Sequence, residues 1–139
     1  MAPSEGAEAT LRAAGIRPTP ARVAVLGELS REPDDVTAQR LHSRLRQRGK
    51  RLGLATVYRT LDALAEAGVI DTLRHHPGEA CYRLCGEEHH HHLLCARCHR
   101  VVEIVDCRLE RWLERVSADH GFLATGHRLE IDGVCGACR

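Results

Sequence analysis

Apolar residues in the first quarter of the chain recur with the spacing of amphipathic helices. The pattern predicts a short helix over residues 7–14 that ends at Gly15. A second helix is predicted to begin at Thr19-Pro20, because threonine caps a helix N-terminus and proline fits its first turn. The apolar stripe of this second helix comprises Val23, Leu26 and Leu29.

Two further helices follow in the first half. One is predicted to begin at Thr37 and to end at Gly49, and the next spans about residues 56–67 and ends at Gly68. In the latter, one buried face is predicted for Val57, Leu61 and Leu64. The other side is predicted to carry Thr56, Arg59, Thr60 and Ala63.

After Gly68 the pattern changes to short runs typical of strands. Residues 69–74 and 80–84 are partly β-branched or aromatic, and His76-Pro77-Gly78 between them predicts a turn. Helices followed by a β-hairpin are typical of a winged helix-turn-helix domain, whose third core helix enters the major groove of DNA.

The rest of the chain predicts a second, smaller domain. Residues 85–88 read as a hinge, which divides a domain over 1–84 from one over 89–139. The second domain is predicted to contain strands over 89–95, 101–105 and 123–131 and a helix over about 109–120. The expected fold class is therefore α+β: an N-terminal winged helix-turn-helix domain and a small C-terminal α/β domain. Because this small number of elements buries little surface, the domain is expected to need a metal or a partner for stability.

Charge separates the two halves. The whole chain of 139 residues has a formal net charge of +1, but residues 1–60 carry +5 and residues 61–139 carry −4. The basic half is expected to meet a polyanion. The sequence has no apolar run long enough for a membrane span and no signal-peptide pattern, so we expect a cytoplasmic protein.

Seven cysteines and ten histidines point to metal binding rather than to disulfides, because the cysteine count is odd and an export signal is lacking. Two C-x-x-C pairs are present, and two such pairs complete the tetrahedral thiolate site that structural zinc prefers. These ligands are Cys95, Cys98, Cys135 and Cys138.

The run His89-His90-His91-His92 enters a predicted strand, where successive side chains point to opposite faces. His89 and His91 therefore share one face, and His90 and His92 share the other. One strand is thus predicted to supply ligands to two different metal sites.

The first of these sites is predicted between the domains. Asp71 on the first hairpin strand and Cys85 at the hinge would join His90 and His92, although Asp71 equally fits an ordinary solvated strand residue. A thiolate in this set favours zinc over manganese, magnesium and iron(II).

The second site is predicted within the C-terminal domain. His89 and His91 would meet Glu110 on the helix and His127 on the last strand. Other residues compete for the same role, namely His99, Glu103 and His120. Cys81 and Cys107 are left over and are expected to be thiols without a metal.

These motifs resemble those of the ferric uptake regulator family. The resemblance rests on Gly53-Leu-Ala-Thr-Val-Tyr-Arg-Thr-Leu61, on the segment from Cys85 to Cys98 and on Cys135-Gly-Ala-Cys138. It covers the chain from about Ala14 to Cys138 and is strongest toward the zinc uptake regulators of actinobacterial type.

The resemblance implies a homodimeric, metal-responsive repressor whose C-terminal domain dimerises. It assigns structural zinc to the four C-x-x-C thiols, regulatory zinc to Asp71, Cys85, His90 and His92, and a further zinc to His89, His91, Glu110 and His127. Two to three zinc ions per chain are therefore expected. Tyr58 and Arg59 match base-reading residues of the recognition helix, and Arg17 matches a residue near the minor groove.

The expected partner is double-stranded operator DNA, with phosphate contacts from exposed basic residues. The predicted DNA-binding residues are Arg17, Lys50, Arg51, Thr56, Tyr58 and Arg59. Neither a membrane nor a small-molecule substrate is expected as a partner.

Three alternatives remain at this point. An iron- or peroxide-sensing repressor of the same family would lack a use for the Cys85 thiol. A zinc hydrolase or deaminase is disfavoured because the sequence has no H-E-x-x-H, no G-x-S-x-G and no H-x-E followed by P-C-x-x-C. A metal buffer would leave the basic half without a purpose.

Overall fold

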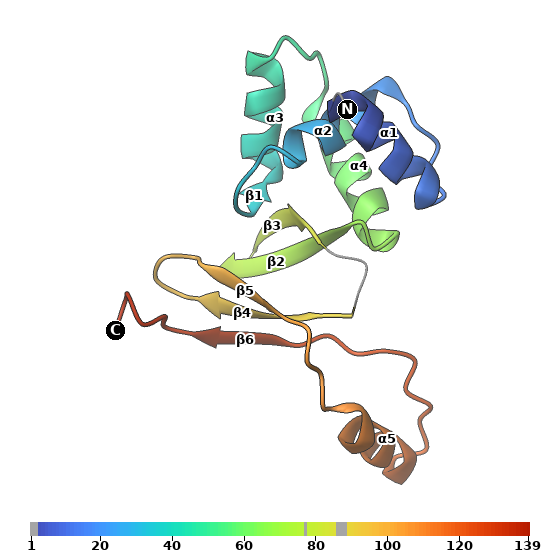
Figure 1. The fold of residues 1–139 in the computed structure, drawn as a ribbon, viewed down its shortest axis with the longest axis vertical. Coiled ribbons are helices and arrows are strands. Elements are labelled where there is room, and N and C mark those ends of the chain that lie inside the picture. The colour runs from blue at the N-terminus through green and yellow to red at the C-terminus, as the bar shows by residue number, and fades with distance from the viewer. Residues whose placement is uncertain (1–2, 77, 86–88) are drawn as a thin grey trace. The chain divides into compact units, whose positions relative to one another are not determined.

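The computed structural model describes residues 3–76, 78–85 and 89–139 (Figure 1). The chain forms two compact units, one over residues 1–87 and one over residues 88–139. Residues 86–88 of the predicted hinge and Pro77 of the predicted turn lie outside the described residues.

The described part of the first unit combines four helices with a small sheet (Figure 1). Its elements in chain order are α1 (Pro3–Ala13), α2 (Pro20–Leu29), β1 (Val36–Thr37), α3 (Ala38–Gln47), α4 (Leu54–Glu66), β2 (Ile70–His76) and β3 (Glu79–Leu84). The strands are antiparallel in the order β1-β3-β2. The predicted helices and hairpin are confirmed, and the two-residue β1 is an element that the sequence pattern did not predict.

Local signals place the helix ends. The hydroxyl oxygen of Thr19 accepts a hydrogen bond from the backbone N–H of Arg22 at 3.3 Å, and that of Thr37 accepts one from Arg40 at 3.2 Å. Both predicted N-caps are therefore confirmed. Gly68, which follows the C-cap residue Ala67 of α4, has a φ of 75°, which favours glycine at the point where the chain leaves the helix for β2.

The core of the first unit is built from aliphatic side chains of all four helices and of the sheet. Thr60 corrects the prediction for α4, because it is only 5% exposed although we expected it on the outer side. It lies three residues after Val57 and four before Leu64, which is the spacing of one helix face. The buried face of α4 is thus wider than its aliphatic stripe.

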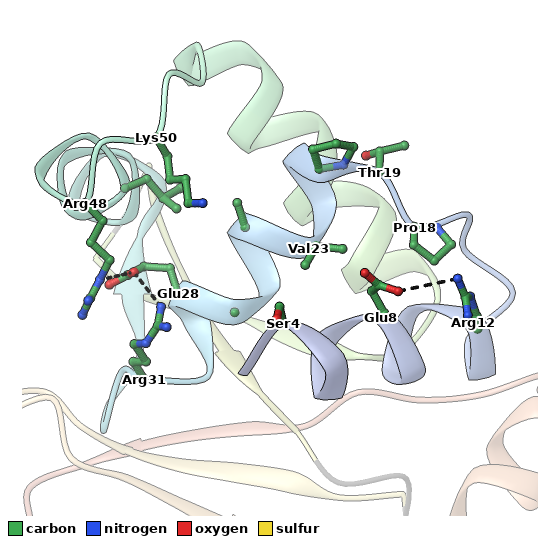
Figure 2. A pocket seen from close by; sticks show the side chains of 14 residues that line it. Ser4, Glu8, Arg12, Pro18, Thr19, Val23, Glu28, Arg31, Arg48 and Lys50 are labelled. Carbon is green, nitrogen blue, oxygen red and sulfur yellow. Dashed lines mark hydrogen bonds and ion pairs between the residues drawn. The ribbon is translucent and has the colours of Figure 1, made fainter. Parts of the chain in front are cut away.

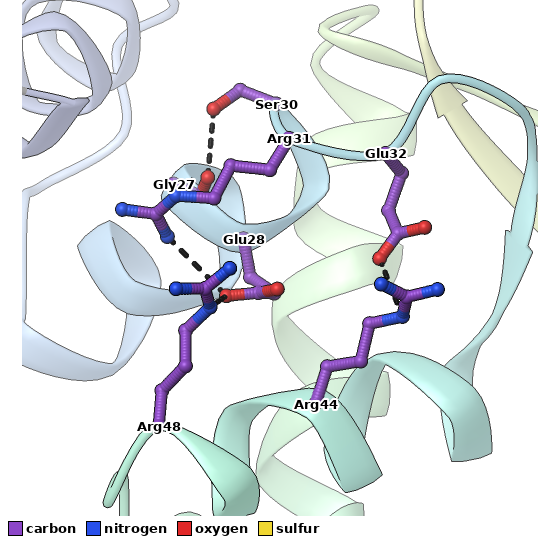
Figure 3. A network of polar contacts seen from close by, with 7 residues as sticks. All are labelled: Gly27, Glu28, Ser30, Arg31, Glu32, Arg44 and Arg48. Carbon is purple, nitrogen blue, oxygen red and sulfur yellow. Dashed lines mark hydrogen bonds and ion pairs between the residues drawn. The ribbon is translucent and has the colours of Figure 1, made fainter.

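A network of ion pairs links α2 and the residues after it to α3 and its C-cap (Figure 3). The carboxylate of Glu28 is 1% exposed, and its Oε2 contacts Nε of Arg48 at 2.6 Å and Nη1 of Arg31 at 3.3 Å. Beside it, Oε1 of Glu32 contacts Nε of Arg44 at 2.8 Å. Three arginines of the basic half therefore form ion pairs within the fold.

The second unit consists of β4 (His91–Cys95), β5 (Val101–Ile104), α5 (Glu110–Asp119) and β6 (Glu130–Gly133). The strand order is β5-β4-β6, with β4 antiparallel to β5 and parallel to β6. The helix is confirmed, but the last strand corrects the prediction of 123–131. The strand pairs with β4 from Glu130 opposite His92 to Gly133 opposite Cys95, and the carbonyl of Leu129 just before it accepts the N–H of His92 at 3.3 Å.

This unit has almost no apolar core. Within residues 89–139 only four residues are buried, and two of them are histidines: His91, His92, Leu94 and Cys95. No residue of α5 is buried. The prediction that this part of the chain needs a metal or a partner follows from the sheet's small buried area.

Candidate metal centres

The four predicted structural thiols meet at one end of the second sheet. Cys95 ends β4, and the parallel pairing of β4 with β6 brings the Cys135 turn beside the Cys98 turn. The sulfur atoms of all four cysteines lie within 4.8 Å of one another, and those of Cys98 and Cys135 are 3.6 Å apart. A zinc tetrahedron with Zn–S bonds of about 2.3 Å has S···S edges of about 3.8 Å, so the thiols fit this ion.

Backbone N–H groups favour the thiolate form at this site. The N–H of Cys135 donates to Sγ of Cys95 at 3.3 Å, and together with the N–H groups of Cys98 and Arg97 it lowers the pKa of Cys95 to about 5. Hydrogen bonding with the thiols of Cys135 and Cys98 raises the pKa of Cys138 to about 12. A bound cation would replace the shared proton.

The alternation of the histidine run is confirmed. The rings of His89 and His91 lie 4.6 Å apart, and those of His90 and His92 lie 5.0 Å apart on the other face. His127, which comes from the segment before β6, joins the first pair with Nε2 at 3.1 Å from that of His89 and 3.1 Å from that of His91.

The fourth member of this group is Cys107, not the predicted Glu110. Among the described residues, the donor atoms of His89, His91, Cys107 and His127 all lie within 4.8 Å of one another, and the Glu110 carboxylate is not part of this set. Glu110 begins α5 and is exposed. Of the competitors, His99 and His120 also lie outside the group.

The hairpin register explains what sequence reasoning missed. β5 runs antiparallel to β4 with Ile104 opposite His91, so residues just after Ile104 lie beside residues just before His91. Cys107 is the first cysteine after that pair. The pairing of β4 with β5 would therefore have placed Cys107 near His89 and His91.

Burial also suits His91 to metal binding. The side chain is 2% exposed, and burial, followed by the neighbouring histidines, lowers the pKa of His91. The neutral imidazole is the form that binds metal ions.

The opposite face of β4 presents a second donor set within this unit. His92 lies directly opposite Glu103 in the β4–β5 ladder, and the donor atoms of His90, His92 and Glu103 lie within 4.8 Å of one another. Glu103 was considered only as a competitor for the other face.

Asp71 and Cys85 both belong to the hairpin of the first unit. Ile70 pairs with Leu84 across the ladder, so the side chains of these two residues lie on one face of the hairpin. Asp71 follows Ile70 and Cys85 follows Leu84, so both of their side chains lie on the other face. The N–H of Cys85 donates to the carbonyl of Val69 at 3.4 Å, and its thiol donates to the carbonyl of Gly68. Because Ile70 points into the core, Asp71 and Cys85 face away from it.

Most of the predicted DNA-binding residues are exposed. Arg17, Lys50, Arg51 and Arg59 are exposed, whereas Thr56 is half-buried. Arg59 donates to the Thr56 hydroxyl at 3.4 Å and lines a cavity of about 220 Å³ between α2 and α4. Tyr58 is half-buried like Thr56, and it packs against the core, so its ring is only partly available.

Two further cavities lie in the first unit. Lys50 and Arg51 line one of about 450 Å³ with His42 and Arg46. Another, of about 500 Å³, lies between α1 and α2, where an ion pair joins Arg12 to Glu8 (Figure 2). Only Lys50 of the predicted DNA-binding residues reaches this cavity.

None of the helices in the described residues has the length and apolar character to cross a bilayer.

Comparisons with known proteins agree with the fold. Residues 13–132 match the model of the ferric uptake regulator family. The zinc uptake regulation protein of Mycobacterium tuberculosis H37Rv is 45% identical over 129 residues, which cover 93% of this chain and 99% of that protein.

More distant relatives carry an iron-related name. The ferric uptake regulation protein of Escherichia coli K12 is 37% identical over 133 residues, covering 93% of this chain and 89% of that protein. The structure of the ferric uptake regulator of Francisella tularensis with iron has a TM-score of 0.70 at 27% identity and covers 89% of this chain and 95% of that one. On the family match and these identities, the chain belongs to the ferric uptake regulator family.

Proposed function

We propose that the protein is a zinc-responsive transcription repressor that binds operator DNA as a homodimer and controls genes of zinc uptake. The observation that carries the proposal is the division of four consecutive histidines between two faces of one strand, each with further metal-binding groups. The name of the M. tuberculosis relative, a zinc uptake regulation protein, supports zinc as the metal.

Two zinc sites would belong to the second unit alone. The four thiols would hold structural zinc, which stabilises a sheet with few buried apolar side chains. The histidine group of His89, His91 and His127 would hold a further zinc.

The regulatory zinc would connect the two units through Asp71 and Cys85 from the first and His90 and His92 from the second. This assignment is supported by the shared face of Asp71 and Cys85 and by that of His90 and His92. A zinc ion held by both units would fix the distance between the two DNA-reading units of a dimer. Zinc therefore has to bind the DNA-competent arrangement more tightly than other arrangements, and by reciprocity DNA should tighten zinc binding.

The dimer contact would lie on the second unit. Its exposed large apolar residues are Leu93, Val102, Val105, Trp112, Phe122, Leu123, Ile131 and Val134. A second copy that covers them would supply the apolar burial that one copy lacks. The repressor would act by binding and not by catalysis, and it would act in the cytoplasm, where its DNA lies.

DNA contact would lie on the first unit. Arg59 would read guanine from the exposed side of α4, and Arg17, Lys50 and Arg51 would contact phosphates. An iron- or peroxide-sensing role is less supported, because the zinc-named relative shares 45% identity, against 37% for the ferric one. The Cys85 thiol favours zinc over iron(II) on chemical grounds.

The test is operator binding as a function of free zinc. In a mobility-shift titration with the promoter of a zinc-transporter gene, Cys85→Ser should require at least 10-fold more free zinc for half-maximal binding. Cys81→Ser, on β3 four residues before Cys85, is the matched control and should bind as the parent does.

Equal zinc responses of Cys85→Ser and the parent would contradict the regulatory assignment. If Glu103→Gln loses the response and Cys85→Ser keeps it, the regulatory ion is held by oxygen and nitrogen ligands of the second unit instead.

A further inference from the structure

We propose that Cys107 is a metal ligand, and that its thiolate completes a three-histidine, one-cysteine zinc site with His89, His91 and His127. This inference deepens the proposed function and rests on it only for the identity of the ion. It replaces Glu110, which the family resemblance assigns to this site.

The distances within the group match one ion. The Nε2 atoms of the three histidines are separated by 3.1, 3.1 and 3.2 Å. Zn–N bonds of about 2.05 Å in a tetrahedron require N···N edges of about 3.3 Å. Sγ of Cys107 lies beside these nitrogens, 3.0 Å from Nε2 of His91 and 3.1 Å from that of His127. With a Zn–S bond of about 2.3 Å the N···S edge of a tetrahedron is about 3.6 Å, so the thiol would move outward by about 0.5 Å when an ion binds.

Burial separates the two possible fourth ligands. His91 is buried, and Cys107 and His127 are half-buried, so the thiol faces a site that is partly shielded from water. Glu110 is exposed at the first residue of α5. A carboxylate would have to leave water and displace the thiol to reach the three nitrogens.

The chain path keeps Cys107 near the site. β5 ends at Ile104, directly opposite His91, and Cys107 follows three residues later. The antiparallel ladder therefore anchors the segment that carries the thiol to the strand that carries two of the histidines.

The donor set selects the ion by its chemistry. Three neutral imidazoles and one thiolate suit Zn²⁺ and Co²⁺, whereas Mg²⁺ and Mn²⁺ prefer sites made of oxygen ligands. A carboxylate in place of the thiolate would make the site harder and less selective for zinc.

Cobalt reports the thiolate directly. The experiment starts from a Cys85→Ser protein whose four-cysteine site is filled with zinc. Two thiols, those of Cys81 and Cys107, then remain available to added Co²⁺. One equivalent of Co²⁺ should then give near-ultraviolet sulfur-to-cobalt charge-transfer absorption, which Cys107→Ser abolishes. Glu110→Gln and Cys81→Ser should both keep it.

Persistence of the charge-transfer absorption in Cys107→Ser would overturn the proposal. So would a result in which Glu110→Gln loses one bound metal per chain while Cys107→Ser keeps its full metal content.

The unsubstituted protein supplies a second readout that does not depend on the folding of a variant. Iodoacetamide alkylation followed by peptide mass spectrometry should label Cys107 at least 10-fold more slowly in the zinc-loaded than in the zinc-depleted protein. Equal labelling rates in the two forms would also overturn the proposal. Neither readout involves DNA, so failure of zinc-dependent operator binding alone would leave this site intact and refute only the repressor function.

Discussion

Glu28 carries a carboxylate that is almost fully buried between α2 and α3, where Arg31 and Arg48 neutralise it. Removing Arg48 leaves the carboxylate with one, longer contact, so we expect Arg48→Met to lower the free energy of unfolding by about 1–3 kcal/mol. Urea denaturation of the zinc-loaded protein measures this loss. Arg40→Met, at an exposed position of α3, is the control and should cost less than about 0.5 kcal/mol.

The Cys81 thiol should make the free energy of unfolding of the first unit depend on pH in the alkaline range. Burial and the neighbouring carboxylate of Asp35, to which the thiol donates, raise the pKa of Cys81 to about 11 from 9.0. The unfolded chain releases this proton at lower pH than the folded one, so unfolding becomes easier as the pH rises from 9 to 11.

The measurement is the free energy of unfolding at pH 8 and at pH 10.5 under reducing conditions. Cys81→Ala should lose less stability over that interval than the parent does. An equal loss in both proteins would show that the Cys81 thiol does not resist ionisation in the fold.

At the scale of elements, the two C-x-x-C turns hold the second unit together. The turn after β4 and the turn after β6 come from segments separated by 36 residues, and β6 itself has only four residues. Cys95→Ser should therefore release the structural zinc and unfold this sheet, because the metal supplies folding free energy that the small core lacks.

Zinc content by atomic absorption and far-ultraviolet circular dichroism check this outcome. Cys81→Ser is the matched control and should keep both. A Cys95→Ser protein with full zinc content and native dichroism would contradict the four-thiolate assignment.

Elements with strong local signals were predictable from the sequence. Thr19 and Thr37 fix two helix starts by hydrogen bonds within three residues, and the alternation of the histidine run follows from strand geometry alone. The four-cysteine group was predictable because each C-x-x-C pair lies within one turn.

Features that depend on distant pairing were not predictable. The short β1 exists because it pairs with β3, and β6 is confined to the residues that lie opposite β4. Cys107 takes the place of Glu110 because of the register between β4 and β5, which the sequence pattern does not specify. Thr60 is buried because the buried face of α4 is wider than its stripe of aliphatic residues, and the stripe alone did not predict this.

At the scale of the whole molecule, the uneven charge predicts how DNA binding responds to salt. Residues 1–60 carry a net charge of +5, and Lys50 and Arg51 are exposed there. Replacing both by glutamine should weaken binding to all sequences alike and reduce the slope of log K against log salt by about one for each phosphate contact removed.

Binding measured from 50 to 200 mM salt tests this effect. Arg111→Gln with Arg115→Gln, two exposed arginines on α5 of the second unit, is the control pair and should leave the slope unchanged. If the control pair changes the slope as much as the Lys50 and Arg51 pair, the DNA contact does not lie on the first unit.

The division of the histidine run between two strand faces has a consequence for how this protein can evolve. Substituting one histidine damages one centre, but inserting or deleting a single residue inside the run would send each later side chain to the opposite face. Such a length change would exchange ligands between both centres at once. Relatives that keep both centres should therefore vary in the identity of these residues far more readily than in their number.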